Sequence, residues 1–140
     1  MDAFAAYSHA IVAMAATAVM LLILGPLSAM KKAKLGLAPG ATPEADYGSR
    51  CYRWHRAYGN LSESIGPFVA VTLAAILAGA NPFWVNLLAS LFLVARLVLA
   101  VVHINGIGKQ DMSIRSYAYV AGLMMCLILA GMAIVATICG

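Results

Sequence analysis

Four long apolar segments dominate the sequence, and apolar runs of this kind are typical of helices that cross a membrane. They extend over approximately Phe4–Met30, Ile65–Ala80, Phe83–Ile104 and Tyr117–Cys139. Of the 140 residues, 64% are hydrophobic and only 10% are charged, so a water-soluble globule of this size would lack the polar side chains to cover its surface. The solvent around these segments is therefore lipid. Because no basic residue precedes the first segment and it is longer than the apolar part of a signal peptide, we expect it to be retained as a helix.

The connections between the segments contain residues that favour turns. The first connection holds Gly36, Pro39, Gly40 and Pro43, the second is a short turn around Asn81-Pro82, and the third carries two glycines. Short connections make successive helices antiparallel neighbours. The sequence therefore predicts a single all-α integral membrane domain over residues 1–140. This domain is an up-down bundle of four transmembrane helices at about 3–30, 49–79, 82–105 and 113–139.

Basic residues are concentrated at one end of the predicted bundle. Six of the nine Lys and Arg residues lie between Lys31 and Arg56, while Lys109 and Arg115 flank the third connection. By the positive-inside rule, the first and third connections face the cytoplasm and both termini face away from it. The predicted location is a bacterial inner membrane, or the endoplasmic reticulum of a eukaryote.

Two other classes of protein are disfavoured. Cys51, Cys126 and Cys139 are far apart and lack metal-ligand spacing, so we expect neither a metal site nor a disulfide framework. The net charge of +4 lies beside membrane segments rather than on a soluble basic module. We therefore expect membrane lipid, and no nucleic acid, as a partner.

Polar residues share one face on each of three predicted helices. At 100° per residue, these faces bring together the following residues: Arg53, Arg56, Asn60 and Glu63 on the second helix, Arg96 and His103 on the third, and Arg115 and Tyr119 on the fourth. The rise per residue places Glu63 and Arg96 level with one another inside the hydrocarbon and the other residues near the cytoplasmic boundary. A charge in the hydrocarbon costs about 2.5–3.5 kcal/mol, so we expect Glu63 and Arg96 to form a structural ion pair. The alternative is that Glu63 accepts the ammonium group of a ligand.

The polar groups on these three faces suit a small zwitterion with several negative charges. Guanidinium groups bind carboxylates through paired hydrogen bonds, and a carboxylate binds an ammonium group. Arg115, Ser116 and Tyr119 together have the groups that stabilise a thiolate. A thiol peptide would satisfy both requirements.

The segment Arg56–Phe68, which reads RAYGNLSESIGPF, resembles the second-helix signature of the MAPEG family, the membrane-associated proteins in eicosanoid and glutathione metabolism. The segments Asn81–Phe83 and Ile114–Ser116, the latter followed by Tyr119, are most similar to the microsomal prostaglandin E synthase branch of that family. Arg96 matches the arginine of the third helix. The resemblance implies a homotrimer with glutathione at each subunit interface, near the cytoplasmic boundary.

The resemblance also implies roles for individual residues. Asn60 and Glu63 would hold the polar backbone of glutathione, and Arg115 would activate its thiolate with help from Ser116. The other binding positions that it implies are those of Arg53, Arg56, His103 and Tyr119. Four positions depart from the family pattern, namely Ser28, Gly59, Leu99 and His103.

Two functions remain open at this point. The first is a glutathione-dependent membrane transferase or peroxidase that acts on lipophilic electrophiles, with a hydrophobic small molecule as its second substrate. The second is a non-catalytic MAPEG-like membrane scaffold or lipid-binding protein.

Overall fold

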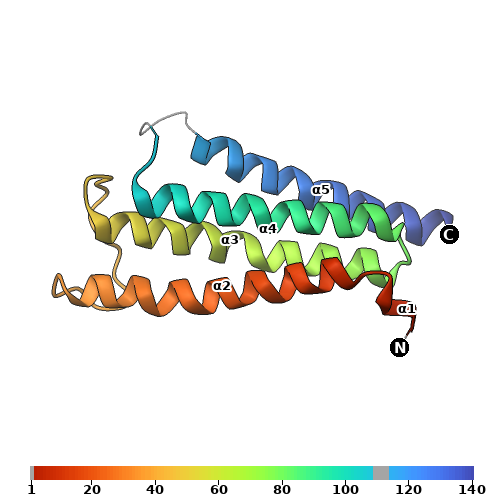
Figure 1. The fold of residues 1–140 in the computed structure, drawn as a ribbon, viewed down its shortest axis with the longest axis horizontal. Helices are drawn as coiled ribbons and strands as arrows, with labels where there is room; N and C mark the ends of the chain where they lie inside the picture. Colours follow the sequence, from red (N-terminus) through yellow and green to blue (C-terminus); the bar gives the residue numbers. More distant parts are fainter. Residues whose placement is uncertain (1, 109–113) are drawn as a thin grey trace.

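Five helices form the described part of the chain, which covers residues 2–108 and 114–140 of a computed structural model (Figure 1). They are α1 (Asp2–Ala5), α2 (Ser8–Ala33), α3 (Arg50–Leu77), α4 (Pro82–Asn105) and α5 (Ile114–Cys139), and no strand occurs among these residues. The four long helices are each long and apolar enough to cross a membrane. The predicted all-α bundle of four transmembrane helices is thus confirmed.

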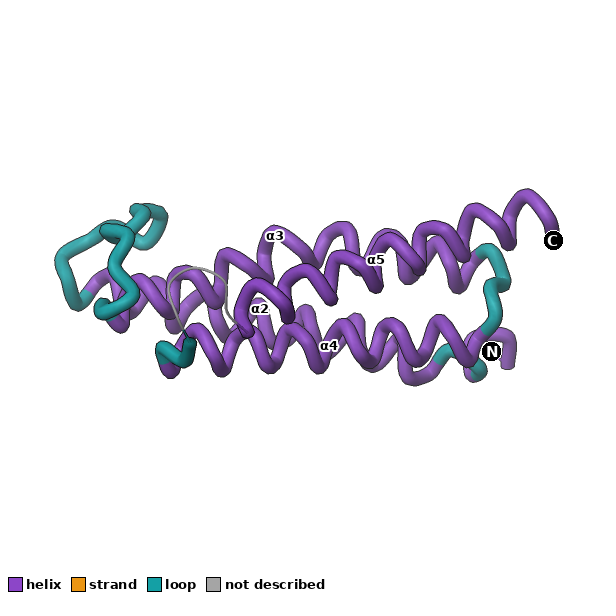
Figure 2. The backbone as a smooth tube through the Cα atoms, turned by 90° about the horizontal axis from the view of Figure 1, so that it is seen from above, coloured by secondary structure: helices purple, strands orange, loops and turns teal. Residues whose placement is uncertain are grey.

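The long helices run up and down the bundle. The helices α2 and α5 each pack against both α3 and α4. Both termini lie at one end of the molecule, and the first connection lies at the other end, toward which α4 ends and α5 begins (Figures 1 and 2). The predicted start of the fourth helix at residue 113, and Lys109 of the charge argument, lie outside the described residues.

Local signals in the sequence explain where α3 and α4 begin and end. The Ser49 hydroxyl accepts a hydrogen bond from the backbone N–H of Tyr52 at the start of α3. At the start of α4, the Asn81 side chain accepts from the N–H of Phe83, and Pro82 takes the first helical position, where its missing N–H is not needed. Gly106 ends α4 in the left-handed conformation, with φ of 66°.

The helix predicted over residues 3–30 is interrupted in the structure. The chain turns at residues 6–7, between α1 and α2, because the Asn86 side chain of α4 takes both partners of one helical hydrogen bond. Its Oδ1 accepts from the N–H of Ala10 at 2.9 Å, and its Nδ2 donates to the carbonyl of Ala6 at 2.7 Å. A side chain inserted between residues i and i−4 breaks a helix locally. At the other end, α2 continues to Ala33, three residues beyond the predicted 30.

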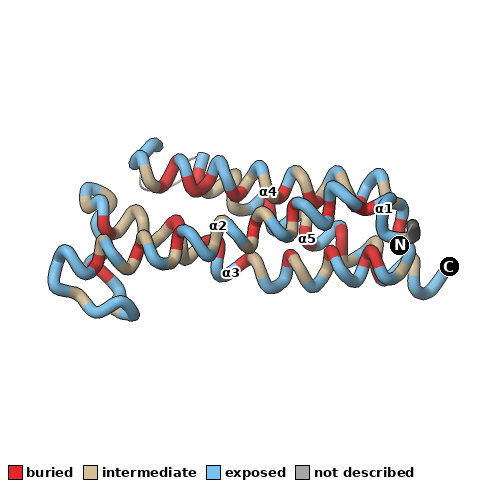
Figure 3. The backbone as a smooth tube through the Cα atoms, turned by 60° about the horizontal axis from the view of Figure 1, so that its bottom comes forward, coloured by how far each residue is buried: buried red, intermediate tan, exposed pale blue. Residues whose placement is uncertain are grey.

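The interior of the bundle is closely packed, while its exterior is apolar. The rings of Phe68 and Phe92 stack at the centre with centroids 3.9 Å apart, and both side chains are fully buried. Small residues such as Ala10, Ala89 and Ala133 allow the helices to approach closely around them. Exposed positions run along every long helix (Figure 3), and many of them are large hydrophobic residues. Such an exterior suits contact with lipid.

Candidate functional site

A polar pocket lies at the end of the bundle opposite the termini. It has a volume of about 340 Å³, which is within the usual range for small-molecule sites. The first connection and three helices form its walls, and the lining residues are Tyr47, Arg56, Asn60, Glu63, His103, Arg115, Ser116, Tyr119 and Val120. The structure therefore brings together seven of the residues that the sequence analysis selected: Arg56, Asn60, Glu63, His103, Arg115, Ser116 and Tyr119.

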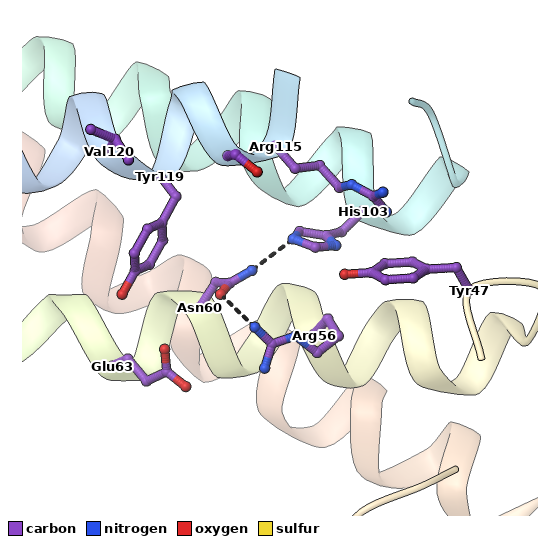
Figure 4. Close-up of a pocket in the computed structure, with 9 residues that line it drawn as sticks. Tyr47, Arg56, Asn60, Glu63, His103, Arg115, Tyr119 and Val120 are labelled. Atoms are coloured by element: carbon purple, nitrogen blue, oxygen red, sulfur yellow. Dashed lines mark hydrogen bonds between the residues drawn. The ribbon is translucent and has the colours of Figure 1, made fainter. Parts of the chain in front are cut away.

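Asn60 is the centre of the hydrogen-bond network in this pocket (Figure 4). Its Oδ1 accepts from Nη2 of Arg56 at 3.1 Å, and its Nδ2 lies 2.7 Å from Nε2 of His103. Because the contact with Arg56 identifies the amide oxygen, the amide nitrogen must be the atom that donates to His103. His103 then accepts through Nε2 and carries its proton on Nδ1. The network joins α3 to α4 and fixes the Asn60 side chain beneath the pocket.

The Arg115 guanidinium lies on the wall of the pocket opposite Asn60 (Figure 4). Arg115 is buried at the start of α5, and its guanidinium carbon is 4.0 Å from the centre of the Tyr47 ring. The same ring stacks beside His103, with centroids 6.1 Å apart and planes inclined by 14°. Tyr47 comes from the first connection. Its place in the pocket could not be predicted from the sequence, because a tyrosine in a connecting segment belongs to no helical face and no motif.

The remaining lining residues differ in exposure. Glu63 is exposed on α3, whereas Ser116 and Tyr119 of α5 are half-buried. Val120, which also belongs to no motif in the sequence, is exposed and adds an apolar edge. The pocket thus combines two guanidinium groups, a carboxylate, an amide, an imidazole and three hydroxyls with an apolar border.

Arg53 occupies a different place from the one predicted for a binding residue. Its Nη1 donates to the backbone carbonyls of Tyr47 at 2.7 Å and Gly48 at 3.0 Å, and its Nε donates to the carbonyl of Ile104 at 3.3 Å. These bonds tie the first connection to the end of α4. Arg53 does not line the pocket. It lies about one turn nearer the start of α3 than Arg56, and this places it level with the connection.

The predicted structural ion pair between Glu63 and Arg96 is absent from the described residues. Arg96 is only 1% exposed, and its Nη2 donates to the backbone carbonyl of Tyr119 at 2.9 Å. Its guanidinium carbon lies 4.8 Å from the ring centre of Phe92 and 5.2 Å from that of Tyr119. Glu63 is exposed and lines the pocket instead. The prediction is wrong because equal depth in the bundle does not place two side chains on facing sides of their helices.

The described residues contain no cluster of side chains suited to a metal ion. Within residues 2–108 and 114–140, no group of three His, Cys, Asp or Glu side chains is arranged to hold a metal ion. All three cysteines are free, with Cys51 and Cys126 buried and Cys139 exposed.

The fold and the pocket define an integral, multi-pass membrane protein with a polar pocket at one end of a four-helix bundle. Comparison with family models gives a match to the MAPEG family over residues 8–135, and the chain belongs to this family. A comparison with curated proteins found no match.

Proposed function

We propose that this protein is a glutathione-dependent transferase or peroxidase that acts on lipophilic electrophiles. The observation that carries the proposal is the pocket itself, in which cationic, anionic and thiolate-stabilising groups line one cavity of about 340 Å³. Membership of the MAPEG family supports the same conclusion.

The groups in the pocket fit the chemistry of glutathione. This peptide carries two carboxylates, one ammonium group and one thiol. Arg56 provides a guanidinium for a carboxylate, Asn60 provides an amide next to it, and the exposed carboxylate of Glu63 is suited to the ammonium group. His103 holds the Asn60 amide in place through the contact at 2.7 Å.

Activation of the thiol is assigned to the start of α5. The first two turns of this helix carry Arg115, Ser116 and Tyr119, and all three line the pocket. A nearby cation lowers the pKa of a thiol and increases the fraction that is present as the nucleophilic thiolate. In the proposal, Arg115 stabilises the thiolate and the two hydroxyls donate hydrogen bonds to it. The lipophilic second substrate arrives through the bilayer and meets the apolar border at Val120.

The proposal includes an assembly and an orientation. The protein acts as a homotrimer, as the family resemblance implies, and a neighbouring subunit covers the exposed side of Glu63. The end of the bundle that carries the pocket faces the cytoplasm, because the basic residues in and beside the first connection are at that end.

The test is thiolate formation by glutathione bound to the purified full-length protein. The wild type is expected to show thiolate absorbance in the ultraviolet at near-neutral pH, where free glutathione is mainly protonated. Arg115→Ala should abolish the signal without preventing folding. The matched control is Arg50→Ala, since Arg50 is exposed and does not line the pocket.

Two results would contradict the proposal. One is a wild-type protein that shows no thiolate at saturating glutathione. The other is an equal signal in wild type and Arg115→Ala. A protein that gives no thiolate but binds vesicles or micelles of anionic lipid through Arg56 and Arg115 would instead be the non-catalytic, lipid-binding alternative.

A further inference from the structure

The first connection forms one wall of the pocket through Tyr47, which lies outside the α3 segment that resembles the family signature. Tyr47 lies outside every helix, is half-buried, and places its ring on the guanidinium of Arg115 at 4.0 Å. Figure 4 shows this ring beside His103, with its hydroxyl directed toward the pocket. A second tyrosine, Tyr52, packs edge-on against the Tyr47 ring with centroids 5.2 Å apart.

Arg53 holds this part of the connection in position. Its side chain donates to the carbonyls of Tyr47 and Gly48 and also to the carbonyl of Ile104 in α4. The backbone N–H of Ser49 donates to the carbonyl of Asp46 at 3.0 Å, which closes a turn around Tyr47. The carbonyls of Tyr47 and Gly48 are thus linked through Arg53 to α3 and to the end of α4, and the turn holds Asp46 against Ser49.

A ring on the face of a guanidinium determines the direction of its hydrogen bonds. All the N–H groups of an arginine lie in the guanidinium plane, so a ring packed on that plane leaves the donors at its edge. The ring also attracts the cation and excludes water from one face. Tyr47 therefore covers one side of the buried Arg115 guanidinium and limits the orientations from which its N–H groups can donate.

We propose that Tyr47 is a positioning residue that orients Arg115 for stabilisation of the glutathione thiolate, and that Arg53 holds Tyr47 in place for this role. The inference rests on the proposed function, because it concerns how Arg115 acts on the thiol. It gives Arg53 an indirect role in place of the direct binding role that the sequence suggested.

The experiment compares the pH dependence of thiolate formation in four variants of the full-length protein in detergent. Other charged or titratable groups that share the pocket with Arg115 are Arg56 and Glu63 from α3, His103 from α4 and Tyr119 from α5, and all are unchanged in these variants. Tyr47→Leu removes the ring and Tyr47→Phe retains it. Arg53→Lys keeps the charge but cannot make the same three hydrogen bonds. Tyr117→Leu is the matched control, because Tyr117 is exposed on α5 outside the pocket.

The expected result is a shift of the thiolate midpoint to higher pH in Tyr47→Leu. The thiolate fraction below the midpoint should fall by about three- to tenfold, which is the size of a cation–π contact expressed as a ratio. Arg53→Lys should shift the midpoint in the same direction, while Tyr47→Phe and Tyr117→Leu should match the wild type. Thermal melting of each variant separates this effect from a loss of folding. Tyr47→Phe should retain both the thiolate midpoint and the melting temperature of the wild type.

The outcomes distinguish this inference from the function on which it rests. If wild type and Tyr47→Leu form thiolate with the same midpoint, the positioning role is wrong and the proposed function stands. The role is also wrong if Tyr47→Phe shifts the midpoint as far as Tyr47→Leu does, because the hydroxyl rather than the ring would then be responsible. If the wild type forms no thiolate but binds glutathione in calorimetry, the assignment of Arg115 fails, and this inference fails with it.

Discussion

Arg96 is a charge in the middle of the bundle that is stabilised without a carboxylate partner among the described residues. One carbonyl and two aromatic faces contact it, while its Nε and Nη1 atoms have no hydrogen-bond partner within residues 2–108 and 114–140. The space for the guanidinium comes from Gly122 of α5. A Cβ atom at this position would overlap the guanidinium of Arg96. A single missing side chain on α5 thus allows a buried arginine on α4.

Gly122→Ala is therefore expected to destabilise the protein. The methyl group would push Arg96 away from the Tyr119 carbonyl, and overpacking of this kind costs about 1–3 kcal/mol in the free energy of unfolding. This outweighs the gain of up to about 1 kcal/mol that alanine brings to a helix interior. Gly131→Ala is the control, because a Cβ atom there meets nothing within 4 Å. Thermal unfolding in detergent should show a lower midpoint for the first variant alone, and equal midpoints would contradict the packing argument.

Glu63→Gln separates binding from stability. Since Glu63 is exposed and forms no ion pair with Arg96 in the described chain, its neutralisation should leave the melting temperature nearly unchanged. As a ligand of the ammonium group, however, its loss should weaken glutathione binding by about 1.5–3 kcal/mol, the contribution of a hydrogen bond to a charged group. Calorimetric titration measures this change. A variant that binds glutathione as tightly as the wild type would refute the ligand role.

Helical periodicity identified most of the residues that line the pocket, but it could not identify which groups contact one another. Asn60, His103 and Arg115 were predicted to converge because each lies on the polar face of its helix. Tyr47 was not predicted, since a connection has no periodicity that says which way a side chain points. The pairing of Arg96 was also beyond prediction, because its partner is a backbone carbonyl and every residue has one.

The helices themselves begin and end where the sequence contains strong local signals. Asn81 with Pro82 and Gly106 bound α4 at its predicted ends, because a capping side chain, a proline and a left-handed glycine each act within a few residues. The break between α1 and α2 has no such signal. It depends on Asn86, which is about 80 residues away in the sequence and becomes a neighbour only in the folded bundle. Local signals alone therefore predict a continuous first helix.

Asn86→Ala tests the contribution of this contact between α4 and the N-terminal helices. Its two hydrogen bonds to the backbone would be lost, and each contributes about 0.5–1.5 kcal/mol. We expect the free energy of unfolding to fall by about 1–2 kcal/mol, because the freed Ala6 and Ala10 groups recover part of the loss by pairing with each other. Asn105→Ala is the matched control, since Asn105 is exposed at the other end of α4 and bonds only within its own helix. Equal melting temperatures of the two variants would show that the Asn86 contact does not stabilise the bundle.

The molecule as a whole has an apolar exterior and an uneven distribution of charge. Large exposed hydrophobic residues surround all four long helices, which is the opposite of a soluble protein and requires lipid or detergent. The basic residues Lys31, Lys32, Lys34 and Arg50 are all at the end of the bundle that carries the first connection and the pocket. Composition alone was sufficient to predict the membrane environment. Helical periodicity predicted the convergence of three polar faces at this end, and the folded arrangement adds the wall that Tyr47 of the first connection forms.

The orientation in the membrane can be tested with a cysteine that the chain already contains. Cys139 is exposed at the end of α5, on the side of the termini, whereas Cys51 and Cys126 are buried. Since the positive end is expected to face the cytoplasm, a maleimide that cannot cross membranes should label Cys139 in sealed, right-side-out vesicles, and Cys139→Ser should remove the label. Thr42→Cys in the Cys139→Ser background places the reporter on the exposed first connection and should react only after the membrane is permeabilised. The reverse pattern would place the pocket on the outer side, away from the glutathione of the cytoplasm, and the proposed function would then lose its supply of thiol.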